Sequence, residues 1–136
     1  MPAAAYVWVG FCAVEVPPSP KVHEREVIVP PVSVDVSTWT LVDDAFRARV
    51  RRLEPQLVFA NEREREAFGE LDATWIVKRG AEGVVVDDGE PFPPAAGEVV
   101  DTTGAGDALA AGFLVGGARL GVETAARCCA RLGAMP

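Results

Sequence analysis

Beyond residue 31, short apolar runs alternate along the chain with longer segments in which apolar residues recur at helical spacing. Runs rich in β-branched residues predict strands, and the mixed segments predict amphipathic helices. The predicted strands span residues 32–36, 57–60, 75–78 and 83–86, and the predicted helices 41–53, 62–68, 106–120 and 122–132. Alternating strands and helices are typical of an α/β fold with a mostly parallel sheet covered by helices.

The first 31 residues follow a different pattern. They hold six of the eleven prolines, and neither helical periodicity nor strand alternation survives among them. We therefore expect an irregular, proline-rich leader over residues 1–31 and a folded part over residues 32–136. The apolar opening of the leader lacks the basic residues with which a secretory signal peptide begins.

Composition narrows the functional classes. A chain of 136 residues with 49% hydrophobic residues is long enough for one domain with a core. Its net charge of -7 argues against nucleic acid as a partner. No stretch reaches the roughly 18 uncharged apolar residues that a membrane span needs. The three cysteines lack metal-ligand spacing, so we expect reduced thiols in a cytoplasmic protein without membrane partners.

A glycine-rich turn precedes the last long apolar segment. Its residues are Asp101-Thr102-Thr103-Gly104-Ala105-Gly106-Asp107. Such a turn places backbone amides at a helix start, where the helix dipole favours anions. The amides of Gly104, Ala105 and Gly106 would hold a phosphoryl group while Asp107 takes a proton from a hydroxyl. The pattern predicts phosphoryl transfer to an alcohol, although a tight turn into a buried helix is a purely structural alternative.

Two better-known glycine motifs do not fit. A P-loop requires Gly-Lys before Ser or Thr, and the chain contains no Gly-Lys pair. A dinucleotide-binding fingerprint requires a third glycine where Leu109 stands.

The stretch 101–107 resembles the signature Asp/Asn-Thr-x-Gly-Ala-Gly-Asp of the ribokinase-like (PfkB) carbohydrate kinases at every fixed position. The resemblance implies that Asp107 is the catalytic base and that residues 104–106 form the anion hole. It also implies that Asp101 and Thr103 lie near a site for a monovalent cation such as K⁺.

A second stretch, Asn61-Glu62-Arg63-Glu64, resembles the Asn-x-x-Glu motif of the same family. The resemblance implies that Asn61 and Glu64 help to hold the magnesium ion and the phosphates of the nucleotide, and oxygen ligands suit magnesium. From the residues alone, Asn61 could equally be a helix N-cap, with Glu62, Glu64 and Glu66 on a charged surface helix.

The third stretch is Lys78-Arg79-Gly80-Ala81-Glu82-Gly83. In the family, the matching Gly-x-x-Gly segment lines the nucleotide site, which implies that role for Gly80 and Gly83. Lys78 could meet a phosphate as a point charge. A simple turn is the alternative for both glycines.

The three stretches occur in family order, and the resemblance covers about residues 32–136. Nothing in residues 1–31 resembles the family's larger amino-terminal part, which binds the sugar. The resemblance therefore implies a partial ribokinase-like domain from an ATP-dependent sugar kinase. A catalytically silent nucleotide-binding or interaction module, and a vitamin or nucleoside kinase, are the alternatives. Because a sheet without its remaining strands leaves an open edge, we also expect self-association, as in a homodimer.

Overall fold

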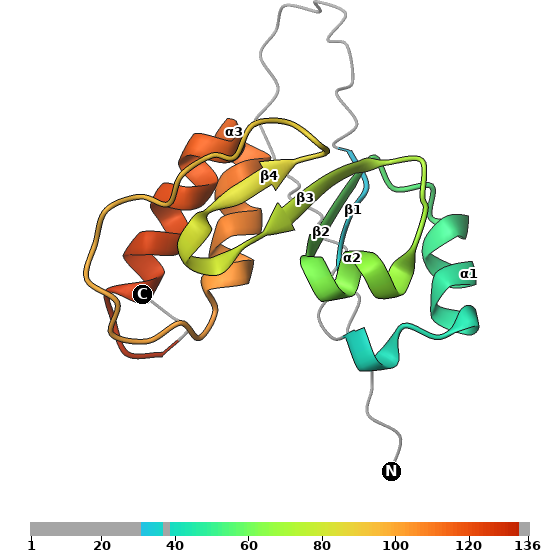
Figure 1. Ribbon diagram of the computed structural model, residues 1–136, viewed down its shortest axis with the longest axis horizontal. Coiled ribbons are helices and arrows are strands. Elements are labelled where there is room, and N and C mark those ends of the chain that lie inside the picture. The colour runs from blue at the N-terminus through green and yellow to red at the C-terminus, as the bar shows by residue number, and fades with distance from the viewer. Residues whose placement is uncertain (1–30, 37–38, 134–136) are drawn as a thin grey trace, which may run out of the picture.

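The computed structural model describes residues 31–36 and 39–133, so nearly all of the predicted leader lies outside the described residues. One four-stranded sheet, in the order β1-β2-β3-β4, organises the fold (Figure 1). Its strands are β1 Ser33–Asp35, β2 Leu57–Asn61, β3 Thr74–Lys78 and β4 Val84–Val86. The first three strands run parallel and β4 is antiparallel to β3. The prediction of a mostly parallel α/β sheet is confirmed.

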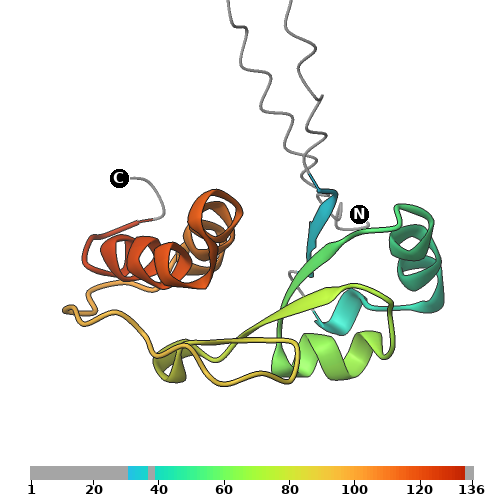
Figure 2. The same ribbon diagram turned by 90° about the horizontal axis from the view of Figure 1, so that it is seen from above.

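Helices cover both faces of this sheet (Figure 2). The α-helices are α1 Asp44–Arg52, α2 Glu62–Phe68 and α3 Ala105–Cys129, and the short 3₁₀ helices are η1 Trp39–Leu41 and η2 Gly80–Glu82. The predicted helix 41–53 begins late, at Asp44, because the Asp43 carboxylate accepts a hydrogen bond from the Phe46 amide at 2.7 Å and caps the helix there.

Alternation along the strands produces two separate cores. In β2, Val58 and Ala60 face α1 and α2, where they pack in one cluster with Trp75 and Phe68. The residue between them, Phe59, points to the opposite face. There it contacts the Phe113 ring of α3 edge-on, with 5.5 Å between ring centroids. The sheet is therefore the middle of three layers.

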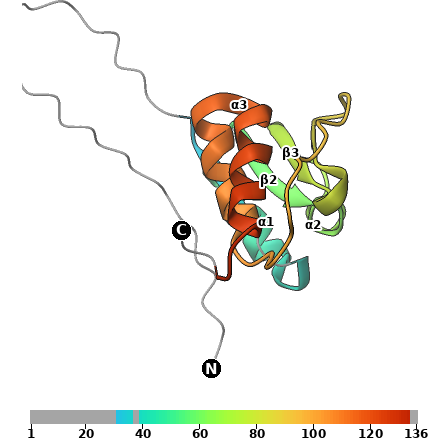
Figure 3. The ribbon, with the colours of Figure 1, turned by 90° about the vertical axis from the view of Figure 1, so that its left-hand side faces the viewer.

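Helix α3 is a helical hairpin. Gly116 and Gly117 interrupt it with non-helical dihedral angles, and Gly117 has a φ of 73° that a glycine adopts without strain. The predicted helices, 106–120 and 122–132, put this break near residue 121, which is wrong because the break lies about one helical turn earlier. The two arms lie side by side (Figure 3), and the Thr124 hydroxyl of the second arm donates a hydrogen bond to the Ala108 carbonyl of the first at 2.7 Å.

By length and composition alone, Ala105–Cys129 is long and apolar enough to cross a membrane. The break changes that comparison, because each arm has roughly 12 residues and is about 18 Å long. The hydrocarbon core of a bilayer is about 30 Å thick. Neither arm reaches across it.

Some apolar side chains remain exposed on the described surface. Val115, beside the break in α3, is 83% exposed, and Val99 before the glycine turn is 67% exposed. Single exposed apolar residues are ordinary on a protein surface and do not by themselves indicate a contact. Self-association stays a prediction.

Substituting Gly112 tests the hairpin. A Cβ there would overlap the Thr124 hydroxyl and approach the Leu120 carbonyl oxygen to 2.7 Å, so the two arms would have to separate. We expect Gly112→Ala to lower the free energy of unfolding by about 1–3 kcal/mol, measured by urea denaturation. Gly97→Ala is the control, because a Cβ at residue 97 meets only the Ala126 Cβ at 4.0 Å. Equal stability of the two variants would contradict the hairpin packing.

Candidate functional site

The candidate site lies where the three parallel strands end. Asp35, Asn61 and Lys78 are the last residues of β1, β2 and β3. Asn61 and Lys78 are register partners on neighbouring strands. The carboxyl edge of the strands is where open α/β sheets bind their ligands. Two of the predicted nucleotide-binding residues are therefore neighbours at the expected edge.

The glycine turn delivers the N-terminus of α3 to Lys78. Gly104 is the N-cap residue, with a left-handed φ of 78°, and no side chain caps this end. A Cβ built on Gly106 would lie 3.5 Å from Lys78 Nζ, so the ammonium group lies beside the first turn of α3. The helix dipole and a lysine charge thus point at one region. This combination favours an anion.

The predicted anion hole differs in detail from expectation. The Ala105 amide donates to the Thr102 carbonyl at 3.1 Å and is used within the turn. Helix geometry leaves the amides of the first turn, including those of Gly106 and Asp107, without acceptors inside the helix. The Asp107 side chain is exposed on the same turn. Donors and a carboxylate thus occur together, as the glycine motif predicts.

Sequence reasoning missed Asp35. Lys78 Nζ donates to both of its carboxylate oxygens, at 2.7 Å and 3.0 Å. The two side chains are 19% and 27% exposed, for Lys78 and Asp35 respectively. A positional signal was present, because Asp35 lies at the end of a predicted strand, as Asn61 and Lys78 do. No sequence motif includes Asp35, however, so the pattern did not single it out.

Asp101 holds the glycine turn together. Its Oδ1 accepts hydrogen bonds from the Thr103 amide at 2.9 Å and the Thr103 hydroxyl at 2.7 Å, and its Oδ2 accepts one from the Gly133 amide at 2.9 Å. The Thr103 amide, then the Gly133 amide, then the Thr103 hydroxyl lower the pKa of the Asp101 carboxyl below its ordinary value. The two predicted cation-site residues therefore lie together, with a structural role in the turn.

The end of α3 closes on the same turn. The Cys129 carbonyl accepts hydrogen bonds from the amides of Val100 at 2.8 Å and Asp101 at 3.1 Å. The Cys128 thiol donates to the Thr103 carbonyl at 3.4 Å. Both cysteines are free thiols, as predicted for this pair. The chain thus enters and leaves the α3 hairpin at one place.

Asn61 and Glu64 form a reciprocal cap at the start of α2. The Asn61 side chain accepts from the Glu64 amide at 2.9 Å, and Glu64 Oε2 accepts from the Asn61 amide at 2.7 Å. The N-cap alternative is thereby confirmed for Asn61, but Glu64 is 4% exposed and so does not lie on the exposed face of α2 with Glu62 and Glu66. A carboxylate has about four lone-pair sites, so the cap leaves acceptor capacity on Glu64.

The described residues, 31–36 and 39–133, contain no group of three His, Cys, Asp or Glu side chains that could hold a metal. Glu64 and Asp101 are thus not members of such a cluster. A single carboxylate suits magnesium, which usually keeps several of its waters and binds through one or two carboxylates. The donor set therefore fits a magnesium ion held mainly by phosphates and water.

Gly80 and Gly83 form a turn after β3. The Gly83 amide donates to the Gly80 carbonyl at 3.1 Å, and both glycines have positive φ. A side chain on Gly83 would overlap the Phe92 carbonyl oxygen, so this glycine permits close approach of the segment that follows β4. Phe92 pairs there with Val84 in an antiparallel bridge, so the chain turns back between these two residues. Both glycines therefore lie in a turn, and their place in the lining of the nucleotide site stays a prediction.

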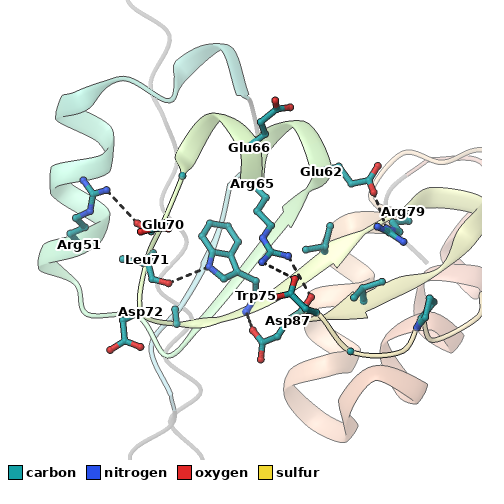
Figure 4. A pocket seen from close by; sticks show the side chains of 17 residues that line it. Arg51, Glu62, Arg65, Glu66, Glu70, Leu71, Asp72, Trp75, Arg79 and Asp87 are labelled. Atoms are coloured by element: carbon teal, nitrogen blue, oxygen red, sulfur yellow. Dashed lines mark hydrogen bonds and ion pairs between the residues drawn. The ribbon is translucent and has the colours of Figure 1, made fainter.

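A separate hollow lies on the face covered by α2 (Figure 4). Three arginines line it, but each is engaged: Arg51 with the Glu70 carbonyl, Arg65 with Asp87 and Asp88, and Arg79 with Glu62. Six acidic residues share the lining with these three arginines, so the net charge of the hollow disfavours a phosphate.

Comparison with known proteins agrees with the geometry of the strand edge. The profile of the pfkB family carbohydrate kinases matches residues 42–135. The chain belongs to the pfkB carbohydrate kinase family. The match includes the segments that carry Asn61, Lys78 and Asp107, while Asp35 precedes it. Comparison with curated proteins found no significant match.

Solved structures of kinases share this pfkB fold. A Burkholderia thailandensis nucleoside kinase in complex with inosine matches with a TM-score of 0.64 at 25% identity, over 76% of this chain and 42% of its own. The adenosine kinase of Sinorhizobium meliloti matches with a TM-score of 0.64 at 28% identity, over 76% of this chain and 41% of its own. The Thermotoga maritima ribokinase matches with a TM-score of 0.55 at 25% identity, over 76% of this chain and 44% of its own. The chain therefore spans less than half the length of these enzymes.

The lowered pKa of Asp101 predicts a pH-dependent contribution to stability. Because folding favours the carboxylate, this contribution is full at neutral pH and is lost as the pH falls through the lowered pKa. We expect Asp101→Asn to lower the midpoint of thermal unfolding at pH 7, and the difference from the unmodified chain to shrink on acidification. Asp72→Asn, at an exposed position, is the matched control. A difference that is independent of pH would contradict the role of the Asp101 charge.

Proposed function

We propose that this chain is the nucleotide-binding part of an ATP-dependent kinase that transfers a phosphoryl group to a hydroxyl of a sugar or a sugar-containing substrate. The observation that carries the proposal is the uncapped N-terminus of α3 with Lys78 Nζ beside its first turn. Membership of the pfkB family supports it. The site residues keep the order and spacing of the family's motifs.

Binding of the phosphates follows from charge. The amides of the first turn of α3 would donate to phosphoryl oxygens, and the Lys78 ammonium would neutralise part of their charge from the side of the sheet. Phosphoryl transfer depends mainly on positioning and on such charge neutralisation. The glycines at positions 104 and 106 leave the backbone accessible to the ligand.

Asp107 is the proposed general base. As the acceptor hydroxyl oxygen forms its bond to the γ-phosphorus, the bond from that phosphorus to the bridging oxygen breaks and ADP leaves. The hydroxyl proton moves to the Asp107 carboxylate. The position of Asp107 on the first turn of α3 suits this step, because the same turn supplies the amides that would hold the phosphoryl oxygens.

Asn61 and Glu64 are the proposed magnesium-organising residues. They would hold a magnesium ion, which would supply neutralisation of the charge on the phosphates of the nucleotide. Glu64 would act through water from its buried position, with its carboxylate oriented by the Asn61 amide. A monovalent cation near Asp101 and Thr103 is a further part of the proposal, supported by the oxygen atoms gathered there.

The acceptor has two candidates. The family profile favours a free sugar. A nucleoside is the second candidate, because the structural neighbours include an adenosine kinase at 28% identity and a nucleoside kinase in complex with inosine at 25%. Both acceptors present a sugar hydroxyl to the same base. A catalytically silent nucleotide-binding module would bind ATP and phosphorylate neither.

Replacing Asp107 tests the proposed reaction. We expect Asp107→Asn to lower the turnover number by about 10²–10⁴ while ATP binding is retained, because only the proton acceptor is lost. ADP release with ribose, adenosine and inosine measures turnover, in this chain and in a full-length pfkB kinase carrying the same seven residues. The exposed Asp72→Asn serves as control in this chain. Turnover in Asp107→Asn within about threefold of the parent would exclude Asp107 as the base.

The proposed magnesium role predicts a difference between two glutamates of α2. Glu64→Gln keeps an oxygen that can accept the cap hydrogen bond but removes the charge, so we expect it to weaken MgATP binding. Glu62→Gln removes only an exposed ion pair with Arg79 and should leave binding nearly unchanged. Isothermal titration calorimetry of both variants, with and without magnesium, measures this. Equal affinities would reduce the Asn61–Glu64 pair to a helix cap.

A further inference from the structure

The position of the Lys78 ammonium requires an explanation. A lysine side chain has four flexible bonds, and fixing it costs conformational entropy. The N-terminus of a helix carries a partial positive charge, which repels an ammonium group. Lys78 Nζ nevertheless lies beside Gly106 in the first turn of α3. Some other group must hold it there before an anion arrives.

Asp35 is that group. Its two carboxylate oxygens accept hydrogen bonds from Lys78 Nζ at 2.7 Å and 3.0 Å. Both side chains are largely shielded from water, which strengthens the attraction relative to that of an exposed pair. An ammonium has three donors, so at least one stays available to a ligand at α3.

The backbone fixes Asp35 at the end of β1, which lies on the other side of β2 from Lys78. Asp35 is the register partner of Phe59 in β2, and the next residue, Val36, donates its amide to the Phe59 carbonyl at 2.8 Å. Strand β3 lies beyond β2, so the ion pair crosses over the end of the middle strand. The carboxylate therefore has a defined place from which to hold the ammonium.

We propose that Asp35 is a positioning residue of the phosphate site, which holds the Lys78 ammonium at the N-terminus of α3 in readiness for the nucleotide. This inference rests on the proposed function. Asp35 need not touch the ligand itself, since its own charge repels phosphate. Its contribution comes through Lys78, which would otherwise have to be ordered when the nucleotide binds.

The direction in which one substitution changes the affinity for MgATP distinguishes positioning of Lys78 from repulsion of phosphate. Neutralising Asp35 should weaken MgATP binding if the carboxylate positions Lys78, and strengthen it if the carboxylate mainly repels phosphate. We expect Asp35→Asn to raise the Kd for MgATP about fivefold or more by titration calorimetry. Asp35→Ser provides a second neutral variant at this half-buried strand end, and Asp35→Glu, which keeps the charge, should restore part of the affinity.

Asp44→Asn is the matched control, because it removes an equal charge from another ion pair, with Arg47 at 2.7 Å on exposed α1. It should leave the Kd unchanged. A double-mutant cycle then tests the route of the effect. In the Lys78→Met background, Asp35→Asn should no longer weaken binding, whereas a general loss of structure would persist there. Circular dichroism and urea unfolding of every variant confirm that the proteins compared are folded.

The outcomes are distinct. Weaker binding that depends on Lys78 supports the inference. Unchanged or tighter binding in the neutral variants, or an equal loss in both backgrounds, overturns it and leaves the proposed function standing. An unmodified chain that binds no MgATP overturns the proposed function and this inference together.

Discussion

Parallel pairing of three short strands is the constraint on which the site depends. In a parallel sheet every strand ends at the same edge, so the residues that end β1, β2 and β3 are brought together although they are far apart in sequence. The pairing also leaves each face to be covered by helices, and α3 covers the face opposite α1 and α2. A shift of one residue in β3 would turn Lys78 to the other face, away from both Asp35 and Gly106.

Glycine contributes at three places for three different reasons. Gly104 supplies the left-handed backbone that starts α3. Gly83 lets the segment after β4 pass against the turn that follows β3, and Gly112 lets the arms of α3 approach each other. Gly104 and Gly83 were both expected to bear on nucleotide binding, whereas no role was predicted for Gly112. In the structure, Gly83 and Gly112 support the positions of the elements around the start of α3.

Much of this arrangement could be predicted from sequence, because local signals and tertiary packing agree. Helix α2 was predicted with its observed bounds, since Asn61 caps it and Gly69 follows its last residue, Phe68. Interactions that join distant segments could not be predicted. The Asp35–Lys78 pair joins β1 to β3 across β2. Glu64 is buried, although its sequence surroundings are equally typical of an exposed helix. The break in α3 was misplaced because several glycines could have supplied it, and only packing of the two arms selects Gly116 and Gly117.

The closure of α3 upon its own entry has a consequence for motion. The Cys129 carbonyl holds the amides of Val100 and Asp101, and Asp101 in turn holds the Gly133 amide. The turn that precedes α3 and the last turn of its second arm are therefore fastened to each other. Neither can open without breaking the hydrogen bonds of the other, so the two should fray and reform as one cooperative unit. The rigidity of the glycine turn before α3 is consequently set at the far end of a helical hairpin, more than twenty residues downstream in the chain.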